Sequence, residues 1–459
     1  MGKKYDFKYI VIGGGPAGTA AAINLAQAKK RVALVEARFF GGSNLNTRDL
    51  PYGVALDFSN LYHKVSTYPE FKNQDITFNL STVPSRTLST VLAAGGNNKK
   101  PIEAAGVVCL TGFAHFLDSH TIAVGSKKFT SENFIIATGA HPKTPDITIQ
   151  DKFHYLTPES AIKVRRLPKL VAVIGAGSTG CEIATYFAEL GSKVALFEKD
   201  TRILPREDKD VSGLMTNYFT KKLGVSVLPT CKVVALEEDH HGPKLTFKYG
   251  NTEKIVRPSA VVLATGSSPN TDLGLENAKV KYKDTGIIVN NLYRTSAKHI
   301  YAIGDCIGGE SSTERAHYQG LTLTTNLINK SKNLLSAKGF VRVTTSSPEI
   351  AVLGNTEKEL SAAKVKYKRS IINLADTTAG KIEGVTHGFV KILTDKTGHI
   401  LGACIIAPHA SLMIQELSLA QRHGLTVLEL ASTPHLMNTM NEAIKLATRN
   451  LLSKKTTKR

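Results

Sequence analysis

Cysteine is scarce in this chain. Among its 459 residues only five are cysteines, namely Cys109, Cys181, Cys231, Cys306 and Cys404. No two of them form a CxxC pair, so neither a zinc site nor a framework of disulfides is expected. We predict that the protein binds no metal and works in the reducing cytoplasm.

Long apolar runs are also missing. No apolar stretch reaches the ~18 residues that a membrane-spanning helix needs, so no membrane span is predicted. Residues 1–6 lack the apolar core of a secretory signal. Hydrophobic residues make up 42% of the chain and charged residues 21%, as in ordinary globular proteins. At ~150 residues a domain, about three domains are expected.

Acidic residues are outnumbered by basic ones. The chain has 58 Lys and Arg against 38 Asp and Glu, which gives a net charge of +20. Such a charge predicts anionic partners, and nucleotide cofactors would be sufficient. Nucleic acid is not expected, because the basic residues are spread along the chain and only the tail at 454–459 is densely basic. A short basic tail is typical of a solvated chain end.

What the sequence does contain is a nucleotide-binding pattern at residues 8–36, around which the chain is organised. Lys8–Ile12 predicts a buried strand, because the segment is short, apolar and β-branched. Thr19–Ala28 predicts a helix, and Arg31–Val35 predicts a second buried strand. A glycine turn of the form GxGxxG joins the first strand to the helix, so the whole pattern is that of a dinucleotide-binding βαβ unit.

Each glycine of this turn has an expected task. Gly13 allows the tight turn, Gly15 lets backbone N–H groups approach a pyrophosphate, and Gly18 lets the helix pack closely on the strand. The helix N-terminus favours the phosphate charge. Glu36, at the end of the second strand, can accept hydrogen bonds from ribose hydroxyls. The alternative is a glycine turn in a βαβ unit that binds nothing.

A second copy of the pattern begins at residue 170. Gly175, Gly177 and Gly180 repeat the turn, and Glu198 repeats the acid. Positions 13 and 36, like positions 175 and 198, are 23 residues apart. Two dinucleotides in one chain indicate hydride transfer between them.

A second repeated motif, a strand ending in Ala-Thr-Gly, indicates that the second dinucleotide module is inserted into the first. Ile135–Gly139 and Val261–Gly266 both end in Ala-Thr-Gly, and Gly304-Asp305 follows a strand that returns to the first module. A Pro-rich linker is expected at 141–145. The predicted parts are a first dinucleotide domain at 1–148, a second at 149–269, the rest of the first at 270–337, and an α+β domain at 338–459.

The chain resembles the pyridine nucleotide–disulfide oxidoreductases, most of all dihydrolipoamide dehydrogenase and mercuric reductase. The resemblance covers residues 6–452 and depends on the two fingerprints, the two Ala-Thr-Gly turns and Gly304-Asp305. It implies an α/β fold with two Rossmann-like domains, for FAD and for NAD(P)H, and a C-terminal α+β domain that forms a homodimer.

The resemblance also implies which residues hold the two dinucleotides. They are Gly13, Gly15, Ala17, Gly18, Glu36, Gly42, Ser43, Ala114, Ala137, Thr138, Gly139, Gly304, Asp305, Ala316, Gly175, Gly177, Gly180, Glu198 and Gly266. Glu198 favours NADH, since a carboxylate repels a 2′-phosphate. The nearby Lys199, Arg202 and Arg206 could accommodate NADPH instead.

The chain departs from the family where the disulfide chemistry should be. The family places two cysteines, separated by four residues, just after the glycine pair that matches Gly41-Gly42, and a lysine soon follows. Here Asn44 and Asp49 occupy the cysteine positions, and Gly53 stands near the lysine's place.

The family's His–Pro near the C-terminus is missing as well. Met437 and Asn438 occupy those two positions, although Glu442 keeps the place of the acid that follows them. A disulfide needs two thiols and an acid–base partner. Because both are absent, thiol–disulfide exchange by the family's route is excluded.

The remaining chemistry is transfer of hydride from NAD(P)H to FAD and then directly to a small-molecule acceptor. A quinone, oxygen, a metal ion or a second nicotinamide would serve. One alternative is a catalytically lapsed protein that binds FAD or senses nucleotides. Another is residual dihydrolipoamide dehydrogenase-like or mercuric reductase-like activity through a different thiol, for which Cys181 is best placed.

Four residues are candidates for catalysis. Asp49 could tune the flavin or transfer a proton, or it could simply pair with Arg48 or cap the next helix. Glu182 matches a family residue near the contact of nicotinamide and flavin, where the usual lysine partner is absent, or it is an ordinary acid in the first turn of a helix. His435 and Glu442 could form an acid–base pair contributed by the partner subunit, or they could cap a helix or belong to the dimer interface.

Overall fold

The computed structural model describes residues 5–71 and 74–453, so the basic tail at 454–459 lies outside the described part. Internal contacts divide the chain into two compact units. The first consists of Met1–Ala55, Ser81–Lys143 and Gly266–Ser336, and the second of Leu56–Leu80, Thr144–Thr265 and Ala337–Arg459. The finer division into four parts that the sequence predicts stays a prediction.

A parallel sheet forms the core of the first unit, with strand order β3-β2-β1-β6 and β19 paired to β6. Its strands are β1 (Phe7–Ile12), β2 (Val32–Glu36), β3 (Val108–Thr111), β6 (Lys127–Ile136) and β19 (Ile300–Ala302). In the central strand, Val11 pairs with Leu34 on one side and Ile135 on the other, and all three are fully buried. Apolar, β-branched runs suit strands that are covered on both faces.

The edge of this sheet differs from the prediction. The sequence pattern predicts that residues 107–110 and 121–124 are strands of one small β-layer. Instead β3 joins the main sheet, where Val108 pairs in parallel with Ala33 of β2. The preceding helix α5 (Lys100–Ala104) provides the crossover that such a parallel pairing needs. The small antiparallel layer consists of β4 (Ala114–Asp118), β5 (Thr121–Val124) and the first half of β6.

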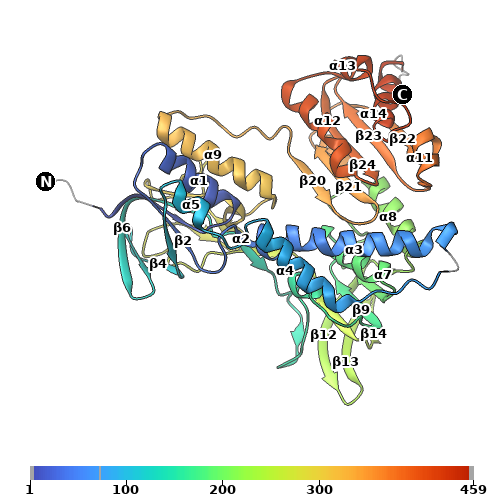
Figure 1. Ribbon diagram of the computed structural model, residues 1–459, viewed down its shortest axis with the longest axis horizontal. Coiled ribbons are helices and arrows are strands. Elements are labelled where there is room, and N and C mark those ends of the chain that lie inside the picture. Colours follow the sequence, from blue (N-terminus) through green and yellow to red (C-terminus); the bar gives the residue numbers. More distant parts are fainter. Residues whose placement is uncertain (1–4, 72–73, 454–459) are drawn as a thin grey trace. The chain divides into compact units, whose positions relative to one another are not determined.

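Helices α1 (Pro16–Gln27) and α9 (Thr313–Asn329) lie side by side in this unit (Figure 1). Small residues allow the contact: a Cβ at Gly320 would lie 2.4 Å from the carbonyl oxygen of Ala17. The other helices that begin in this unit are α2 (Gly42–Asn46), α3 (Asp49–Thr67) and α4 (Val83–Ala93). Helix α3 continues into the second unit.

Two short strands carry the chain out of the first unit and back into it. They are β7 (Ala140–Pro142) and β16 (Ser267–Pro269), paired antiparallel. Beyond them the N–H of Lys143 donates to the carbonyl of Gly266 at 2.9 Å. The predicted linker is therefore half of a two-stranded ribbon. A second ribbon consists of β17 (Tyr282–Lys283) and β18 (Gly286–Ile287).

The second unit repeats the dinucleotide-binding arrangement. Its parallel sheet has the order β11-β10-β9-β15. A second sheet has the order β14-β13-β12-β8, with β14, β13 and β12 antiparallel and β8 parallel to β12. The elements are β8 (Thr148–Ile149), α6 (Pro158–Ala161), β9 (Leu170–Ile174), α7 (Ser178–Glu189), β10 (Lys193–Phe197), α8 (Lys209–Lys221), β11 (Ser226–Leu228), β12 (Cys231–Asp239), β13 (Gly242–Tyr249), β14 (Thr252–Val256) and β15 (Ala260–Leu263).

An antiparallel sheet with helices completes the second unit. Its strand order is β20-β21-β24-β23-β22, and α12 and α14 pack against it (Figure 1). The strands are β20 (Val341–Thr344), β21 (Glu349–Gly354), β22 (Lys368–Asn373), β23 (Phe389–Thr394) and β24 (Ile400–Ala407). The helices are α10 (Glu357–Ala362), α11 (Thr378–Ile382), α12 (Ala410–His423), α13 (Val427–Ser432) and α14 (Glu442–Ser453). Thus the predicted α+β character of this region is confirmed.

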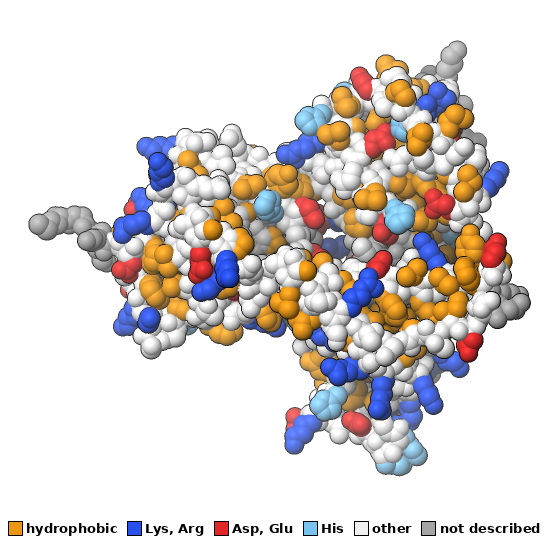
Figure 2. Space-filling view, in the orientation of Figure 1, with side chains coloured by type: hydrophobic (Ala, Val, Ile, Leu, Met, Phe, Trp, Pro, Cys, Tyr) orange, Lys and Arg blue, Asp and Glu red, His pale blue; other side chains and the backbone are white. Residues whose placement is uncertain are grey.

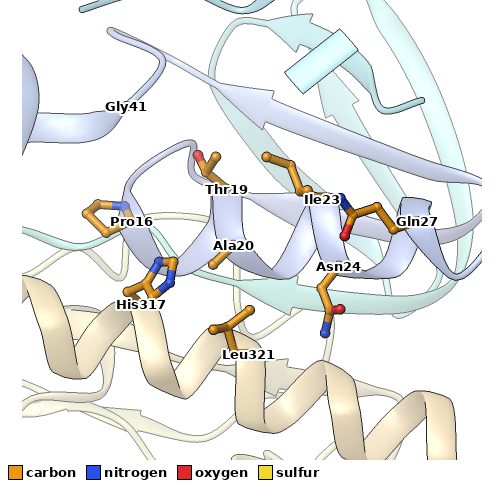
Figure 3. Close-up of a pocket in the computed structure, with 9 residues that line it drawn as sticks. All are labelled: Pro16, Thr19, Ala20, Ile23, Asn24, Gln27, Gly41, His317 and Leu321. Carbon is orange, nitrogen blue, oxygen red and sulfur yellow. The ribbon is translucent and has the colours of Figure 1, made fainter. Parts of the chain in front are cut away.

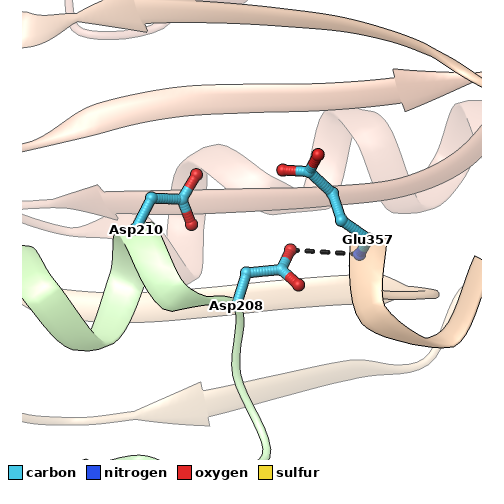
Figure 4. Close-up of side chains that lie close together, drawn as sticks. All are labelled: Asp208, Asp210 and Glu357. Atoms are coloured by element: carbon cyan, nitrogen blue, oxygen red, sulfur yellow. Dashed lines mark hydrogen bonds between the residues drawn. The ribbon is translucent and has the colours of Figure 1, made fainter. Parts of the chain in front are cut away.

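A buried lysine ties this α+β part to the second dinucleotide module. Asp208 and Asp210 at the start of α8 and Glu357 at the start of α10 converge (Figure 4). The Nζ of Lys391, whose side chain is 1% exposed, lies 2.7, 2.8 and 3.2 Å from their carboxylates. Burial alone would lower the pKa of Lys391, but the hydrogen bonds that its ammonium group donates to Asp208 and Asp210 outweigh burial and raise the pKa. Removing one member of such a buried set typically costs about 3–5 kcal/mol of stability.

Across residues 5–71 and 74–453, no helix combines the length and the hydrophobicity that crossing a membrane requires.

Candidate functional site

The first glycine turn connects β1 to α1 and is tightly packed from behind. Gly13 has a φ of +110°, and a Cβ there would lie 2.2 Å from the carbonyl oxygen of Ala137. A Cβ at Gly18 would lie 1.9 Å from the carbonyl oxygen of Gly13. Both positions therefore require glycine, for the turn and for the close packing of helix on strand.

The front of the turn is open by comparison. The nearest atom to a Cβ at Gly15 would be the Cα of Gly42, 3.9 Å away. Gly15 is the N-cap of α1 and has no side chain to offer the first N–H groups of the helix. Those donors suit the phosphates of a dinucleotide, so the turn fits the predicted ligand.

The second turn reproduces the first in detail. Gly177 caps α7 with φ −73° and ψ −169°, where Gly15 caps α1 with −76° and −174°. A Cβ at Gly180 would lie 1.8 Å from the carbonyl oxygen of Gly175, whereas one at Gly177 would meet nothing within 4 Å. The two copies share their backbone geometry, not only their sequence pattern.

The two acids also occupy equivalent places. The Glu36 carboxylate accepts from the N–H of Gly14 at 2.6 Å and from that of Arg38 at 2.7 Å. The Glu198 carboxylate accepts from the N–H of Ala176 at 2.8 Å and from that of Asp200 at 3.0 Å. Each acid is thus fixed across its glycine turn, where a ribose is expected.

Asp305 lies in the 3-10 turn Gly304–Ile307 that follows β19. Burial raises the pKa of its carboxyl, and the charge of Asp49 raises it further, while a hydrogen bond with Ser311 and the charge of Arg48 lower it. A half-buried carboxylate whose desolvation outweighs its partners suits a hydroxyl donor from a ligand, as the predicted contact with the ribityl chain requires.

The remaining residues that the resemblance predicts to contact a dinucleotide lie on several elements. Two hydrogen bonds fix Thr138, which lies just before β7. Its Oγ1 donates to the carbonyl of Asn270 at 2.8 Å, and the side-chain amide of Asn270 donates to the carbonyl of Thr138 at 2.7 Å. Ala17 and Ala316 lie in α1 and α9, Gly42 and Ser43 begin α2, Ala114 begins β4, Ala137 and Gly139 flank Thr138, and Gly266 precedes β16. Their roles in binding stay predictions.

A hydrogen-bonded trio stands where the family has its disulfide. The Asn44 amide donates to the Asp49 carboxylate at 2.6 Å, across the two positions that match the cysteines. Thr313, the first residue of α9, donates to the same oxygen of Asp49 at 2.8 Å, and Asn44 Nδ2 lies 3.0 Å from the Thr313 hydroxyl. The position near the absent lysine, Gly53, is exposed.

Glu182 has acquired different partners in place of that lysine. Its Oε1 accepts from both the N–H and the hydroxyl of Thr345, each at 2.9 Å. One turn earlier on α7, the hydroxyls of Ser178 and Thr344 are 2.6 Å apart. Glu182 is the fifth residue of α7, so it is not the first-turn acid of the alternative interpretation.

The burial of the cysteine thiols disfavours a redox role for them. Cys181 is fully buried, and burial, followed by the charges of Glu182 and Glu198, raises the pKa of its thiol well above 9.0. Burial likewise raises the pKa of Cys109 and of Cys306 to about 11. Thiols of this kind form little thiolate and are poor nucleophiles.

The C-terminal candidates do not meet in one hydrogen bond. The Nε2 of His435 lies 2.7 Å from the Glu416 carboxylate, and the His435 side chain is 5% exposed. Glu442, at the start of α14, accepts from the N–H of Asn438 at 3.3 Å. Each therefore has a partner within its own protomer, and their joint catalytic role stays a prediction.

A shallow groove of about 300 Å³ runs along α1 and α9 (Figure 3). Its lining includes Ala20, Ile23 and Leu321. At one end Pro16, Gly41 and Thr19 adjoin the glycine turn, and Thr19 Oγ1 donates to the carbonyl of Gly14 at 2.9 Å. The groove is mostly apolar and lies beside the predicted phosphate site instead of containing it.

Two equivalent glycine turns with paired acids, each at the start of its own helix, define an oxidoreductase with two dinucleotide sites. The description of a matching family model agrees: pyridine nucleotide-disulphide oxidoreductase over residues 7–320, with the family's dimerisation domain over residues 340–448. The chain therefore belongs to this family, and it is a flavin-dependent NAD(P)H oxidoreductase. Family members use FAD and NAD(P)H.

Named relatives show the breadth of the family. Dihydrolipoyl dehydrogenase of Bacillus subtilis is 31% identical, over 94% of both chains. Mercuric reductase of Bacillus cereus is 29% identical over 96% of this chain and 71% of that one. Among solved structures, LpdA from Mycobacterium tuberculosis has a TM-score of 0.88 and 25% identity, covering 97% of this chain and 99% of that one.

Sequence reasoning missed the residues that hold the candidates in place. Thr313 and Thr345 lie in segments with no motif, 264 and 163 residues away from the acids they contact. Nothing local in the sequence indicates such pairings. The missing cysteines and the missing lysine were the only signal that new partners were needed.

Proposed function

We propose that this enzyme passes hydride from NAD(P)H to FAD and then gives the electrons directly to a small-molecule acceptor, with no disulfide between flavin and acceptor. The observation that carries the proposal is the trio of Asn44, Asp49 and Thr313 in the disulfide's place. An amide and a carboxylate cannot store an electron pair as two thiols do. The acceptor must therefore react at the flavin itself.

The chain's own residues supply binding and orientation. Gly13, Gly15 and Gly18 would admit the FAD pyrophosphate to the start of α1, and Asp305 would accept from a hydroxyl of FAD. FAD, when bound, supplies the two-electron chemistry. At the second turn, Glu182 would orient the nicotinamide end of NAD(P)H, fixed by Thr345.

NADH is the proposed donor. Glu198 is fixed by two backbone N–H groups, so its negative charge stays beside the expected ribose. Arg202, one of the three basic residues that could accommodate a 2′-phosphate, donates instead to the carbonyls of Pro205 and Glu207 at 3.2 and 2.9 Å. A guanidinium engaged in this way gives NADPH less help.

A homodimer is proposed for the C-terminal region, which matches the dimerisation domain of the family. Large apolar side chains stand exposed there: Leu412 is 71% exposed, Leu436 76% and Met437 73%. Exposed apolar patches of this kind mark interaction surfaces. The cytoplasmic location stays a prediction.

The decisive experiment is anaerobic stopped-flow mixing of the FAD-loaded protein with NADH and, separately, with NADPH. We expect loss of the flavin absorbance with NADH at a rate above that with NADPH. Subsequent mixing with a quinone, oxygen or oxidised lipoamide should give fast re-oxidation by one of the first two and none by lipoamide. A flavin that stays oxidised with both nicotinamides would instead support a lapsed binding protein.

A second candidate, disulfide or metal-ion reduction through another thiol, is disfavoured by the burial of Cys181. Cys181→Ala should leave every measured rate unchanged. A loss of acceptor reduction without a loss of flavin reduction would restore the thiol hypothesis.

A further inference from the structure

The trio of Asn44, Asp49 and Thr313 fixes a carboxylate at the positions where the family has its disulfide. Asp49 receives hydrogen bonds from Asn44 and Thr313 on one oxygen, and its side chain is exposed. Three separate helices, α2, α3 and α9, contribute one residue each. A carboxylate held from two sides cannot swing away from the place that the family gives to a neutral disulfide.

Acids outnumber bases in the two segments that contribute residues to this site. Segments 48–49 and 305–315 contain the acids Asp49, Asp305, Glu310 and Glu314 and the bases Arg48 and Arg315. Four acids against two bases give these segments a formal charge of −2, in a chain whose net charge is +20. Of these groups, Asp49 and Arg48 act on the charge of Asp305, whereas Glu310 pairs with Arg315 at 3.5 Å.

Asp49 exerts its charge on the residue predicted to hold the flavin. The charge of Asp49 raises the pKa of Asp305, after burial, while Arg48 opposes it. Asp49 and Asp305 therefore share one electrostatic environment. An acceptor that comes to the flavin from the disulfide's side must pass this environment, and the field of fixed charges changes encounter rates by about 10–1,000-fold.

We propose that Asp49, fixed by Asn44 and Thr313, makes the enzyme select cationic or neutral electron acceptors over anionic ones. This inference rests on the proposed direct transfer from flavin to acceptor. It names the class of acceptor that the site admits. The chain's overall charge would by itself favour the opposite class.

Two trivalent complexes of opposite charge test the selection. Hexaammineruthenium(III) is a cation and ferricyanide an anion, and each accepts one electron. One NADH therefore yields NAD⁺, one proton and two reduced complexes, whichever acceptor is used. The measured quantity is the ratio of kcat/KM for the cation to that for the anion.

The variant is Asp49→Asn, which removes the charge and keeps an oxygen for the donors Asn44 and Thr313. We expect the cation-to-anion ratio to fall about tenfold or more at low ionic strength, and the difference to shrink as salt screens the charge. The matched control is Asp284→Asn, which removes an exposed carboxylate from the turn between β17 and β18 of the same unit. An unchanged ratio, or the same change in both variants, would overturn the proposal.

Two further measurements separate this proposal from the function on which it rests. The bound flavin is reduced chemically, without NADH, and then mixed with each complex; the same inequality and the same loss in Asp49→Asn are expected. The midpoint potential of the flavin, titrated in both variants, should shift positive in Asp49→Asn alone, because a nearby negative charge disfavours the reduced anion. If NADH fails to reduce the flavin while these results hold, only the direct-transfer function is wrong.

Discussion

At the scale of single residues, the informative side chains are buried acids with unusual partners. Glu189 on α7 accepts from the Ser59 hydroxyl at 2.7 Å, and Asn60 in turn donates to the Ser347 hydroxyl at 2.8 Å. Burial raises the pKa of Glu189 from 4.5 to about 6, although hydrogen bonds with Ser59, Ser347 and Asn60 and the charge of Lys64 oppose the shift. Near neutral pH the buried Glu189 carboxylate is therefore ionised at a cost in folding free energy.

A pH-dependent difference in stability follows for Glu189→Gln. Because the native pKa lies above the unfolded one, folding favours the protonated acid. That stabilisation is complete below about pH 4.5 and is lost as the pH rises through about 6. The neutral variant should gain on the original by about 2 kcal/mol in free energy of unfolding between pH 4.5 and 7.5.

Urea titrations at the two pH values measure this gain. The control is Glu383→Gln at an exposed position, for which no such trend is expected. A difference between Glu189→Gln and the original that stays constant with pH would contradict the pKa assignment.

At the scale of elements, the glycine turns separate two tasks, holding the fold and admitting the ligand. Gly180→Ala would place a Cβ 1.8 Å from the carbonyl oxygen of Gly175, whereas Gly177→Ala would meet no protein atom within 4 Å. The backbone of Gly177 is extended, a conformation that alanine adopts without strain.

These two variants should therefore fail in different ways. Gly177→Ala should fold normally and keep FAD, but its KM for NADH should rise about tenfold or more, because the methyl group occupies the space expected for the pyrophosphate. Gly180→Ala should lower the thermal midpoint of the protein. Equal KM values for Gly177→Ala and the original would show that the second turn is not the nicotinamide site.

The elements also show how far sequence reasoning extends. Both fingerprints, the α/β fold class and the α+β region could be predicted, because each depends on local patterns of strand, turn and helix. Strand β22 was missed, since Lys368 and Arg369 weaken its apolar pattern. The trio of Asn44, Asp49 and Thr313 could not be predicted, because it joins three helices that only the folded chain brings together.

At the scale of the whole molecule, the distribution of charge and the assembly into a dimer bear on function. Figure 2 shows Lys and Arg side chains dispersed over the visible face and interspersed with Asp and Glu. A dispersed charge is poorly suited to one nucleic-acid groove, and it is compatible with attraction of anionic cofactors. The formal charge of −2 on segments 48–49 and 305–315 is therefore an exception in a basic chain.

Assembly can be tested on the exposed face of α12. Leu412 and Leu419 are seven residues apart, so they share one side of the helix, and they are 71% and 59% exposed. We expect the original to sediment as a dimer and the double variant Leu412→Asp, Leu419→Asp to sediment as a monomer. Ile255→Asp, on the exposed strand β14, is the control and should remain dimeric. A double variant that remains dimeric would place the interface elsewhere.

The ribbon of β7 and β16 has a consequence for the history of such proteins. Residues 144–265 leave and re-enter the first unit between Lys143 and Gly266, whose backbones share one hydrogen bond. An inserted segment with adjoining ends can be exchanged when the incoming segment keeps its contacts with the rest of the chain, here the carboxylates that neutralise Lys391. A recombination with both breakpoints in this ribbon would exchange the predicted NAD(P)H-binding segment and keep the predicted FAD-binding residues of the first unit. Donor preference and acceptor preference could then be inherited separately.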